Sequence, residues 1–238
     1  LRQEAKHCGL KPNFSILDAS DSAGIVGELL RNADKAQIRA IQSRISMWKN
    51  ALLTPEAALE VAQDALERGA ARLFAEYERT LRAYQAVDFD DLIRLPALLF
   101  ESDAEVLSRW QGRLRYLLVD EYQDTNRCQY RMLKSLAGPR AAFTAVGDDD
   151  QSIYAWRGAD VENLNTLKED FPQLKVIKLE QNYRSTTRIL KAANSLIANN
   201  PKLFEKRLWS ERGHGAEIRG HVCRDGEHEA ELVVMKLQ

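Results

Sequence analysis

The sequence predicts an α/β fold joined to a helical part, and two observations support this prediction. Between residues 115 and 180, short apolar runs alternate with helical stretches, which is the order of a parallel sheet with flanking helices. Residues 1–100 instead space their apolar side chains three and four positions apart, which is typical of amphipathic helices. We therefore expect a helical subdomain over 1–100, an α/β domain over 101–181 and the start of a second α/β unit over 182–238.

Composition limits the classes of protein to which the chain can belong. The chain has 238 residues, 45% of them hydrophobic, and a formal net charge of -1, so any site for a polyanion must be local. Cys8, Cys128 and Cys223 match neither a disulfide framework nor a metal-ligand spacing. The sequence has no apolar run long enough to span a bilayer and no signal-like start, which predicts a cytoplasmic protein without a membrane partner.

The helices expected in the first part of the chain follow two apolar stripes. The first stripe begins after Ser22, and the second follows Thr54, a favoured N-cap, with Pro55 at the first helical position. The stripes consist of Ile38, Ile41, Ile45, Trp48 and Leu52, and of Leu59, Ala62, Leu66, Leu73, Tyr77, Leu81 and Tyr84. Because residues with this spacing share one face of a helix, we expect the aromatic members Trp48, Tyr77 and Tyr84 to lie in the core.

Three carboxylates interrupt the second stripe between Val87 and Ile93. Asp88, Asp90 and Asp91 fit ordinary capping at the start of a helix, where acidic side chains are favoured. Phe89 stands among them, and the residues alone favour a core position for it over a functional one. A further short helix is expected over residues 103–111, before the sheet begins.

Three apolar runs of strand length follow, and each of them ends in polar residues. The runs and their polar ends are 115–119 with Asp120 and Glu121, 142–146 with 147–151, and 176–179 with 180–185. Helices expected over 125–136 and 161–171 separate the runs. Because the carboxyl ends of parallel strands meet at the rim where α/β folds bind ligands, we expect these loops to converge on one site. An acidic pair at such a rim can hold Mg²⁺, although a lone pair is more often a solvated strand end.

The segment after the second run combines aromatic and cationic side chains in a polar loop. Tyr154, Trp156 and Arg157 suit stacking on a base or binding of an anion, and a buried Trp that anchors the loop is an equal alternative. Farther on, a helix is expected to begin at Ser185. A strand near 216–223 and a helix near 226–236 would begin the second α/β unit.

Three long motifs in these loops carry a specific family resemblance. DEYQD at 120–124, VGDDDQSIYAWRGA at 146–159 and LEQNYRST at 179–186 resemble motifs II, III and IV of the UvrD/Rep/PcrA-type superfamily 1 DNA helicases. The helical first part resembles subdomain 1B of this family, with Rep-like members nearest, and residues 87–93 resemble a motif that contacts single-stranded DNA. The resemblance implies a partial RecA-like P-loop NTPase motor domain (1A), an α-helical 1B subdomain and the start of a second RecA-like domain (2A).

The resemblance also implies roles for the residues that match the motifs. Asp120, with Glu121 beside it, would hold Mg²⁺, and Glu121 would orient and deprotonate the attacking water. Gln151 would sense the γ-phosphate of ATP, Arg184 would reach that phosphate as an arginine finger, and Tyr183 would stack on the adenine. The residues expected at single-stranded DNA are Phe89, Tyr154, Trp156 and Arg157. For Phe89, the resemblance thus replaces the core position that the residues alone favour.

These roles imply a fragment of an ATP-dependent 3′-to-5′ DNA helicase that uses ATP and Mg²⁺. Its expected partners are single-stranded DNA, single-strand/duplex junctions, and replication or repair proteins. The sequence contains no Gly-Lys-Ser or Gly-Lys-Thr phosphate loop, which this family places before the position of Leu1, so we expect the fragment alone not to turn over ATP. A non-catalytic module that binds single-stranded DNA or a protein partner is the alternative, and it would explain the missing loop without truncation.

Overall fold

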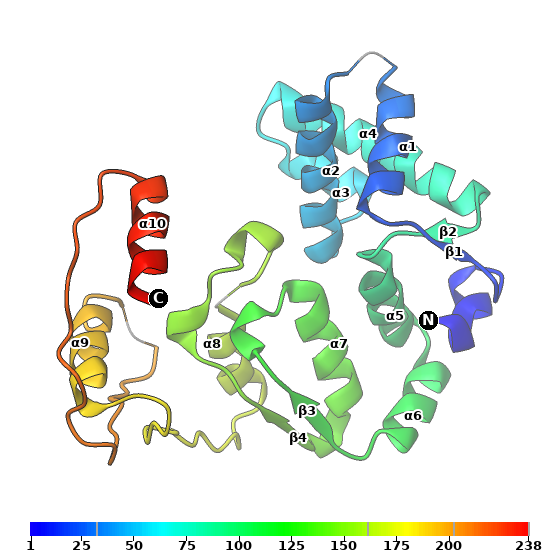
Figure 1. Cartoon of the computed structure of the whole chain (residues 1–238). Coiled ribbons are helices and arrows are strands. Elements are labelled where there is room, and N and C mark those ends of the chain that lie inside the picture. Colours follow the sequence, from blue (N-terminus) through cyan, green and yellow to red (C-terminus); the bar gives the residue numbers. More distant parts are fainter. Residues whose placement is uncertain (32, 161, 202, 238) are drawn as a thin grey trace. The chain divides into compact units, whose positions relative to one another are not determined.

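Helices pack around small parallel sheets in this chain, and the elements fall into two units (Figure 1). The computed structural model describes residues 1–31, 33–160, 162–201 and 203–237. Unit 1 comprises Leu1–Leu174 and unit 2 comprises Lys175–Gln238. The fold class is therefore a helix-rich mixture of α and β structure, as the sequence predicts. None of the helices in the described parts of the chain combines the length and the apolar character needed to cross a bilayer.

The helical part of unit 1 contains a short 3-10 helix, η1, and four α-helices within the described residues. They are η1 (Arg2–Cys8), α1 (Ala19–Leu30), α2 (Lys35–Asn50), α3 (Pro55–Val61) and α4 (Ala65–Ala83). The core between α1, α2 and α4 is apolar, and in it the rings of Trp48 and Phe74 stack with their centroids 6.2 Å apart. Trp48 and Tyr77 are buried, as expected.

The second stripe is not one continuous helix. Asp64 begins α4 as its N-cap and accepts a hydrogen bond of 2.8 Å from the backbone N–H of Glu67, so the chain breaks between α3 and α4. The break changes which side chains face the core, and Leu59, Leu66 and Tyr84 are exposed. The expectation of a core position for Tyr84 is therefore wrong.

The α/β part of unit 1 is built on a parallel pair of strands. β3 (Leu117–Val119) pairs with β4 (Phe143–Ala145), with Leu118 opposite Thr144. The helices of this part are α5 (Asp91–Ser102), α6 (Ala104–Arg113), α7 (Arg127–Ala137) and α8 (Glu162–Asp170). Residue 161, where the last of these was expected to begin, lies outside the described residues. Apolar side chains of α7 and α8 pack on one face of the pair, around Tyr122 and Phe143.

β3 is only partly buried, although its sequence is a continuous apolar run. Leu117 and Val119 pack against the core that contains Tyr122, but Leu118 is 82% exposed. Successive side chains of a strand point to opposite faces, so Leu118 lies on the face turned away from α7 and α8.

A second parallel pair brings the N-terminal segment to the start of α5. β1 (Ser15–Ile16) pairs with β2 (Ala86–Val87), and Val87 is buried against Leu10 and Phe14. Two-residue strands carry no recognisable periodicity, so the sequence did not predict them. Their role in the fold is to fix the loop of residues 88–90, which follows β2 directly.

Unit 2 contains α9 (Thr187–Ile197) and α10 (Gly226–Leu237). The strands expected over 176–179 and 216–223 are absent from its described residues, where pairing is limited to an isolated bridge between Gln181 and Trp209. An apolar run becomes a strand only when a neighbouring strand satisfies its backbone groups, which explains both wrong predictions. The helix expected near 226–236 is confirmed by α10.

Candidate functional site

The acidic pair lies at the carboxyl end of β3. Asp120 and Glu121 follow β3 directly, and both are exposed. The backbone N–H of Val146 donates to the carbonyl oxygen of Val119 at 2.8 Å, so the ends of β3 and β4 remain paired up to this point. Glu121 has a left-handed backbone with φ 48° and ψ 45°, which is costly for a residue with a Cβ.

Gln123 connects the acidic pair to the loop after β4. It is buried, and its Nε2 donates a hydrogen bond of 2.8 Å to Oε2 of Glu121. Its Oε1 accepts a hydrogen bond of 3.0 Å from the backbone N–H of Asp148. A Cβ at Gly147 would lie 2.9 Å from that same Oε1, so only glycine allows this close approach. Sequence reasoning missed Gln123 because nothing in its local pattern separates it from an ordinary polar loop residue.

Gln151 lies in the loop that Gln123 holds. Residues Asp149–Gln151 form a 3-10 turn, and Nε2 of Gln151 donates to Oδ2 of Asp148 at 2.7 Å. A chain of hydrogen bonds therefore runs from Glu121 through Gln123 and Asp148 to Gln151. Within unit 1, two of the three polar loops expected to converge do meet.

The aromatic side chains that the resemblance places at single-stranded DNA line one groove in unit 1. Phe89, Tyr154 and Trp156 border a groove of about 680 Å³, with α1 and α2 forming much of the rest of its wall. Phe89 is 57% exposed and Trp156 is 71% exposed, so neither is a core anchor. The core position that the residues alone favour for Phe89 is wrong, because Asp88 and Asp90 hold the backbone on either side of it. The side chain of Arg157 lies outside the described residues.

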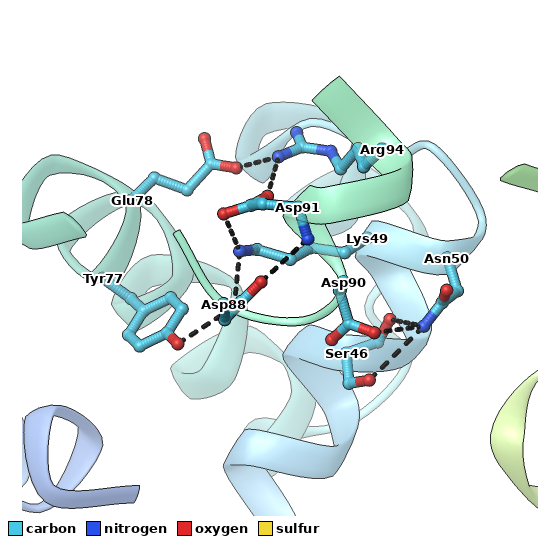
Figure 2. A network of polar contacts seen from close by, with 9 residues as sticks. All are labelled: Ser46, Lys49, Asn50, Tyr77, Glu78, Asp88, Asp90, Asp91 and Arg94. Carbon is cyan, nitrogen blue, oxygen red and sulfur yellow. Dashed lines mark hydrogen bonds and ion pairs between the residues drawn. The ribbon is translucent and has the colours of Figure 1, made fainter. Parts of the chain in front are cut away.

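A buried ion-pair network holds Asp88 and Asp91, which are close to Phe89 in the chain (Figure 2). The side chain of Lys49 is 0% exposed, and its Nζ donates to Oδ2 of Asp88 at 2.7 Å and to Oδ2 of Asp91 at 2.8 Å. The hydroxyl of Tyr77 donates to the same oxygen of Asp88 at 3.0 Å. A buried ammonium is tolerated only when it is paired in this way. Burial alone would lower the pKa of Lys49, but the charges of Asp91 and Asp88 outweigh burial and raise it.

This network shows that the capping interpretation of the acidic cluster is incomplete. Asp88 does accept a hydrogen bond from the backbone N–H of Asp91, at 2.9 Å, as a cap would. Asp90, at the N-cap position of α5, makes no capping bond and instead accepts from Asn50. The sequence did hold one signal for Lys49, which lies four positions after the buried Ile45 and therefore on the apolar stripe.

Tyr183 and Arg184 lie in unit 2, in a loop with its own internal hydrogen bonds. Oδ1 of Asn182 accepts from the backbone N–H of Arg184 at 3.0 Å, and the hydroxyl of Tyr183 donates to Oε1 of Gln181 at 2.8 Å. The side chain of Arg212 donates to the carbonyl oxygens of Tyr183 and Arg184. The convergence of this third loop with the other two remains a prediction.

Comparison with known proteins adds an independent finding about the whole chain. The model of the UvrD/REP helicase N-terminal domain matches residues 1–172, and the model of the UvrD-like helicase C-terminal domain matches residues 177–238. The chain is 53% identical over 240 residues to the ATP-dependent DNA helicase Rep of Escherichia coli (strain K12), covering 100% of this chain and 36% of that relative.

More distant relatives match over the same extent. The chain is 43% identical over 240 residues to the ATP-dependent DNA helicase Rep of Buchnera aphidicola subsp. Acyrthosiphon pisum, covering 100% of this chain and 36% of the relative. It is 40% identical over 241 residues to the ATP-dependent DNA helicase PcrA of Staphylococcus aureus (strain Mu50), covering 100% of this chain and 33% of the relative. The chain thus spans about a third of the length of the curated relatives that it matches.

Proposed function

We propose, from the premise that this chain belongs to the UvrD/REP helicase family, that it forms part of an ATP-dependent 3′-to-5′ DNA helicase. In this proposal, residues 1–100 are a 1B subdomain, 101–181 are part of a RecA-like 1A domain, and 182–238 begin a RecA-like 2A domain. The observation that carries it is the hydrogen-bond chain from Glu121 through Gln123 to Asp148 and Gln151, beside an aromatic groove. Such a motor couples ATP hydrolysis to movement on DNA and needs its nucleotide loops linked to its DNA-facing loops.

The acidic pair fits Mg²⁺ and ATP. Mg²⁺ prefers oxygen ligands and is commonly held by one or two carboxylates together with phosphate oxygens, and Asp120 and Glu121 offer such oxygens on an exposed rim. The bound ion would neutralise negative charge on the phosphates. Oδ1 of Asp120 accepts the backbone N–H of Glu121 at 2.9 Å, which sets the direction of its carboxylate.

The remaining steps belong to side chains of this chain. Glu121 takes the proton of the attacking water, and its carboxylate is oriented for this by Gln123. Gln151 senses the γ-phosphate, and its hydrogen bond to Asp148 ties that contact to the segment that continues to Tyr154 and Trp156. From unit 2, Arg184 stabilises charge on the γ-phosphate and Tyr183 stacks on the adenine.

The aromatic groove suits unpaired bases. Phe89, Tyr154 and Trp156 offer ring faces, and the ring centroids of the last two lie 6.3 Å apart. Stacking on an aromatic side chain is tolerant of sequence and contributes about 1–3 kcal/mol per base. Arg157 would add a cation nearby. The proposed partners are single-stranded DNA and single-strand/duplex junctions, together with replication or repair proteins, and a cytoplasmic location remains a prediction.

One sequence observation favours a second candidate function. The 238 residues contain no Gly-Lys-Ser or Gly-Lys-Thr loop to bind the β-phosphate, so the chain alone is expected not to hydrolyse ATP. A module that binds single-stranded DNA or a protein without catalysis would have the same groove. The first candidate remains favoured because Asp120, Glu121, Gln151 and Arg184 are all present, which a binding module does not need.

The test compares ATP hydrolysis and duplex unwinding by the protein encoded by the full reading frame that contains this chain. We expect DNA-stimulated ATPase and unwinding of a 3′-tailed duplex, and we expect Glu121→Gln to abolish both while ATP binding persists. Glu105→Gln, on the exposed face of α6, is the matched control and should behave as the unsubstituted protein. Absence of ATPase with tight binding of single-stranded DNA would establish the second candidate instead.

A further inference from the structure

Asn50 is the last residue of α2, and its buried amide contacts segments that are far apart in the sequence. Its Nδ2 donates to the carbonyl oxygen of Ser46 and to Oδ1 of Asp90, both at 2.9 Å (Figure 2). Its Oδ1 accepts a hydrogen bond of 2.6 Å from Nδ2 of Asn126. Both the donor and the acceptor of this amide are therefore used, which is what a buried amide requires.

Two of the partners of Asn50, Asp90 and Asn126, belong to segments next to the proposed functional residues. Asp90 follows Phe89 directly, so its bond to Asn50 fixes one side of the Phe89 loop. Asn126 is the N-cap of α7, which begins shortly after the acidic motif, and it forms a capping box with Gln129. Asn50 thus joins a base-facing loop to the segment that follows the acidic pair.

The loop that carries Trp156 also passes against this pair of asparagines. Gly158 has φ 84°, and a Cβ there would lie 3.7 Å from Cβ of Asn50 and 4.0 Å from Cβ of Asn126. The next residue, Ala159, forms an antiparallel bridge with Asn126. The loop that carries Trp156 therefore packs closely against Asn50 and Asn126 where it turns at Gly158.

The Phe89 loop is anchored on both sides by consecutive residues of α2. Lys49 holds Asp88 through its ammonium, and Asn50 holds Asp90 through its amide, while the ring of Phe89 between them remains exposed in the groove. A loop that is fixed before binding loses less conformational entropy when a ligand arrives. The anchoring therefore favours binding without requiring contact between Asn50 and the ligand.

We propose that Asn50 is a positioning residue for single-stranded DNA, because it holds the Phe89 loop and the Trp156 loop in one arrangement against the start of α7. This inference rests on the proposed function, since it assumes that the groove binds unpaired bases. The inference adds Asn50 to the proposed site, although neither the sequence motifs nor the apolar stripes indicate this residue.

The test exchanges the donor and the acceptor of the hydrogen bond between Asn50 and Asp90 in the full-length protein. Asn50→Asp puts two carboxylates at the 2.9 Å contact with Asp90, and we expect it to weaken binding of a fluorescent oligo(dT) by about tenfold, the loss of one stacking contact. Asn50→Asp combined with Asp90→Asn restores the bond between these two positions with its polarity reversed, but not the bond to the carbonyl oxygen of Ser46, and should recover most of the affinity that Asn50→Asp loses. Asn165→Asp is the matched control, because Asn165 also donates to a carboxylate, that of Glu162 at 3.0 Å, on α8.

A further variant separates positioning from simple charge repulsion. Asp90→Ala removes a negative charge near the groove, so electrostatics alone would strengthen DNA binding, whereas loss of the anchor would weaken it about as much as Asn50→Asp does. Asp90 is half-buried, so this variant also decides the matter if Asn50→Asp does not fold.

Each outcome has a definite meaning. Weakened binding by Asn50→Asp and by Asp90→Ala, with rescue by the reversed pair and native unfolding temperatures, supports the proposal. Unchanged affinity in Asn50→Asp, tighter binding by Asp90→Ala or failure of the reversed pair to restore binding overturns it. If the unsubstituted protein does not bind oligo(dT), the proposed function fails and this inference fails with it. If every variant binds oligo(dT) normally, the inference about Asn50 is wrong but the proposed function stands.

Discussion

The amide of Gln123 donates a 2.8 Å hydrogen bond to the carboxylate of Glu121, and the same side chain accepts the backbone N–H of Asp148 at 3.0 Å. One buried residue therefore sets the direction of the proposed water-activating carboxylate and the position of the next polar loop. Burial favours this arrangement, because leaving the buried amide of Gln123 without hydrogen-bond partners would lower the free energy of unfolding by about 1–3 kcal/mol. The loops that follow β3 and β4 are consequently held in a fixed position relative to each other.

Gln123→Ala should lower the turnover number of DNA-stimulated ATP hydrolysis by about tenfold to a hundredfold in the full-length protein. The reason is that Glu121 loses the donor that orients it, although its own side chain is intact. Steady-state ATPase assays at saturating ATP and DNA measure this effect. Gln37→Ala, at an exposed position of α2, should leave turnover unchanged. A natively folded Gln123→Ala protein with normal turnover would show that Glu121 needs no such support.

Trp156→Ala should weaken binding of single-stranded DNA by about 1–3 kcal/mol, because one base loses its stacking surface. Its side chain is 71% exposed, so the substitution should leave the free energy of unfolding nearly unchanged. Anisotropy titrations with oligo(dT), together with urea unfolding, measure the two quantities. Trp209→Ala in unit 2 is the control for loss of an indole. Unfolding of Trp156→Ala with intact DNA affinity would return Trp156 to the role of a loop anchor.

The polar network around Asp88 should make the protein sensitive to alkali. The charges of Asp91 and Asp88 outweigh burial and raise the pKa of Lys49 above its ordinary 10.5, and burial raises the pKa of Tyr77 above its ordinary 10.0. Both groups hold their protons more tightly in the folded protein than in the unfolded chain. Their contribution to stability is therefore fully present below about pH 10 and is lost as pH rises toward the folded-state values.

Urea unfolding between pH 8 and pH 12 tests this dependence. Tyr77→Phe removes the hydroxyl that bonds Asp88 at 3.0 Å, so we expect a loss of about 0.5–1.5 kcal/mol at pH 8 and a shallower decline above pH 10. Tyr84→Phe, at an exposed position, should follow the unsubstituted protein. Parallel curves for all three proteins would mean that Tyr77 does not contribute to the alkaline transition.

The structure also explains how far the sequence could predict this fold and site. β3, β4, α7 and α8 were predictable, because the two strands are short apolar runs with polar ends and the two helices space their apolar side chains three and four positions apart. β1 and β2 are too short to leave a pattern, and the break before α4 depends on Asp64. The three long motifs indicated the acidic pair and the aromatic residues through their resemblance to a helicase family, since the residue types alone left other interpretations open.

The residues that position the site were not predictable in this way. In the sequence, Asn50 and Gln123 look like ordinary surface residues, and only its place on the apolar stripe sets Lys49 apart from one. The roles of these three residues depend on partners 25 to 76 positions away in the chain, at Asp88, Asn126 and Asp148. Burial of an amide or ammonium follows from tertiary packing, which no local spacing records. The supporting residues therefore become apparent only in the folded chain, whereas the proposed reactive residues are indicated by motifs in the sequence.

Two glycines provide a paired test of the close approach at Gln123. A Cβ at Gly147 would lie 2.9 Å from Oε1 of Gln123 and 3.3 Å from the backbone nitrogen of Gln123, so Gly147→Ala must displace the buried amide. We expect this variant to be destabilised by about 1–3 kcal/mol, as in overpacked cores, and to lose ATPase activity together with Gln123→Ala. Gly69→Ala in α4 meets no heavy atom within 4 Å and should instead stabilise the protein by about 0.5–1 kcal/mol, since alanine favours a helix. Urea unfolding of both variants measures the difference, and equal effects at the two positions would mean that Gln123 can shift without cost.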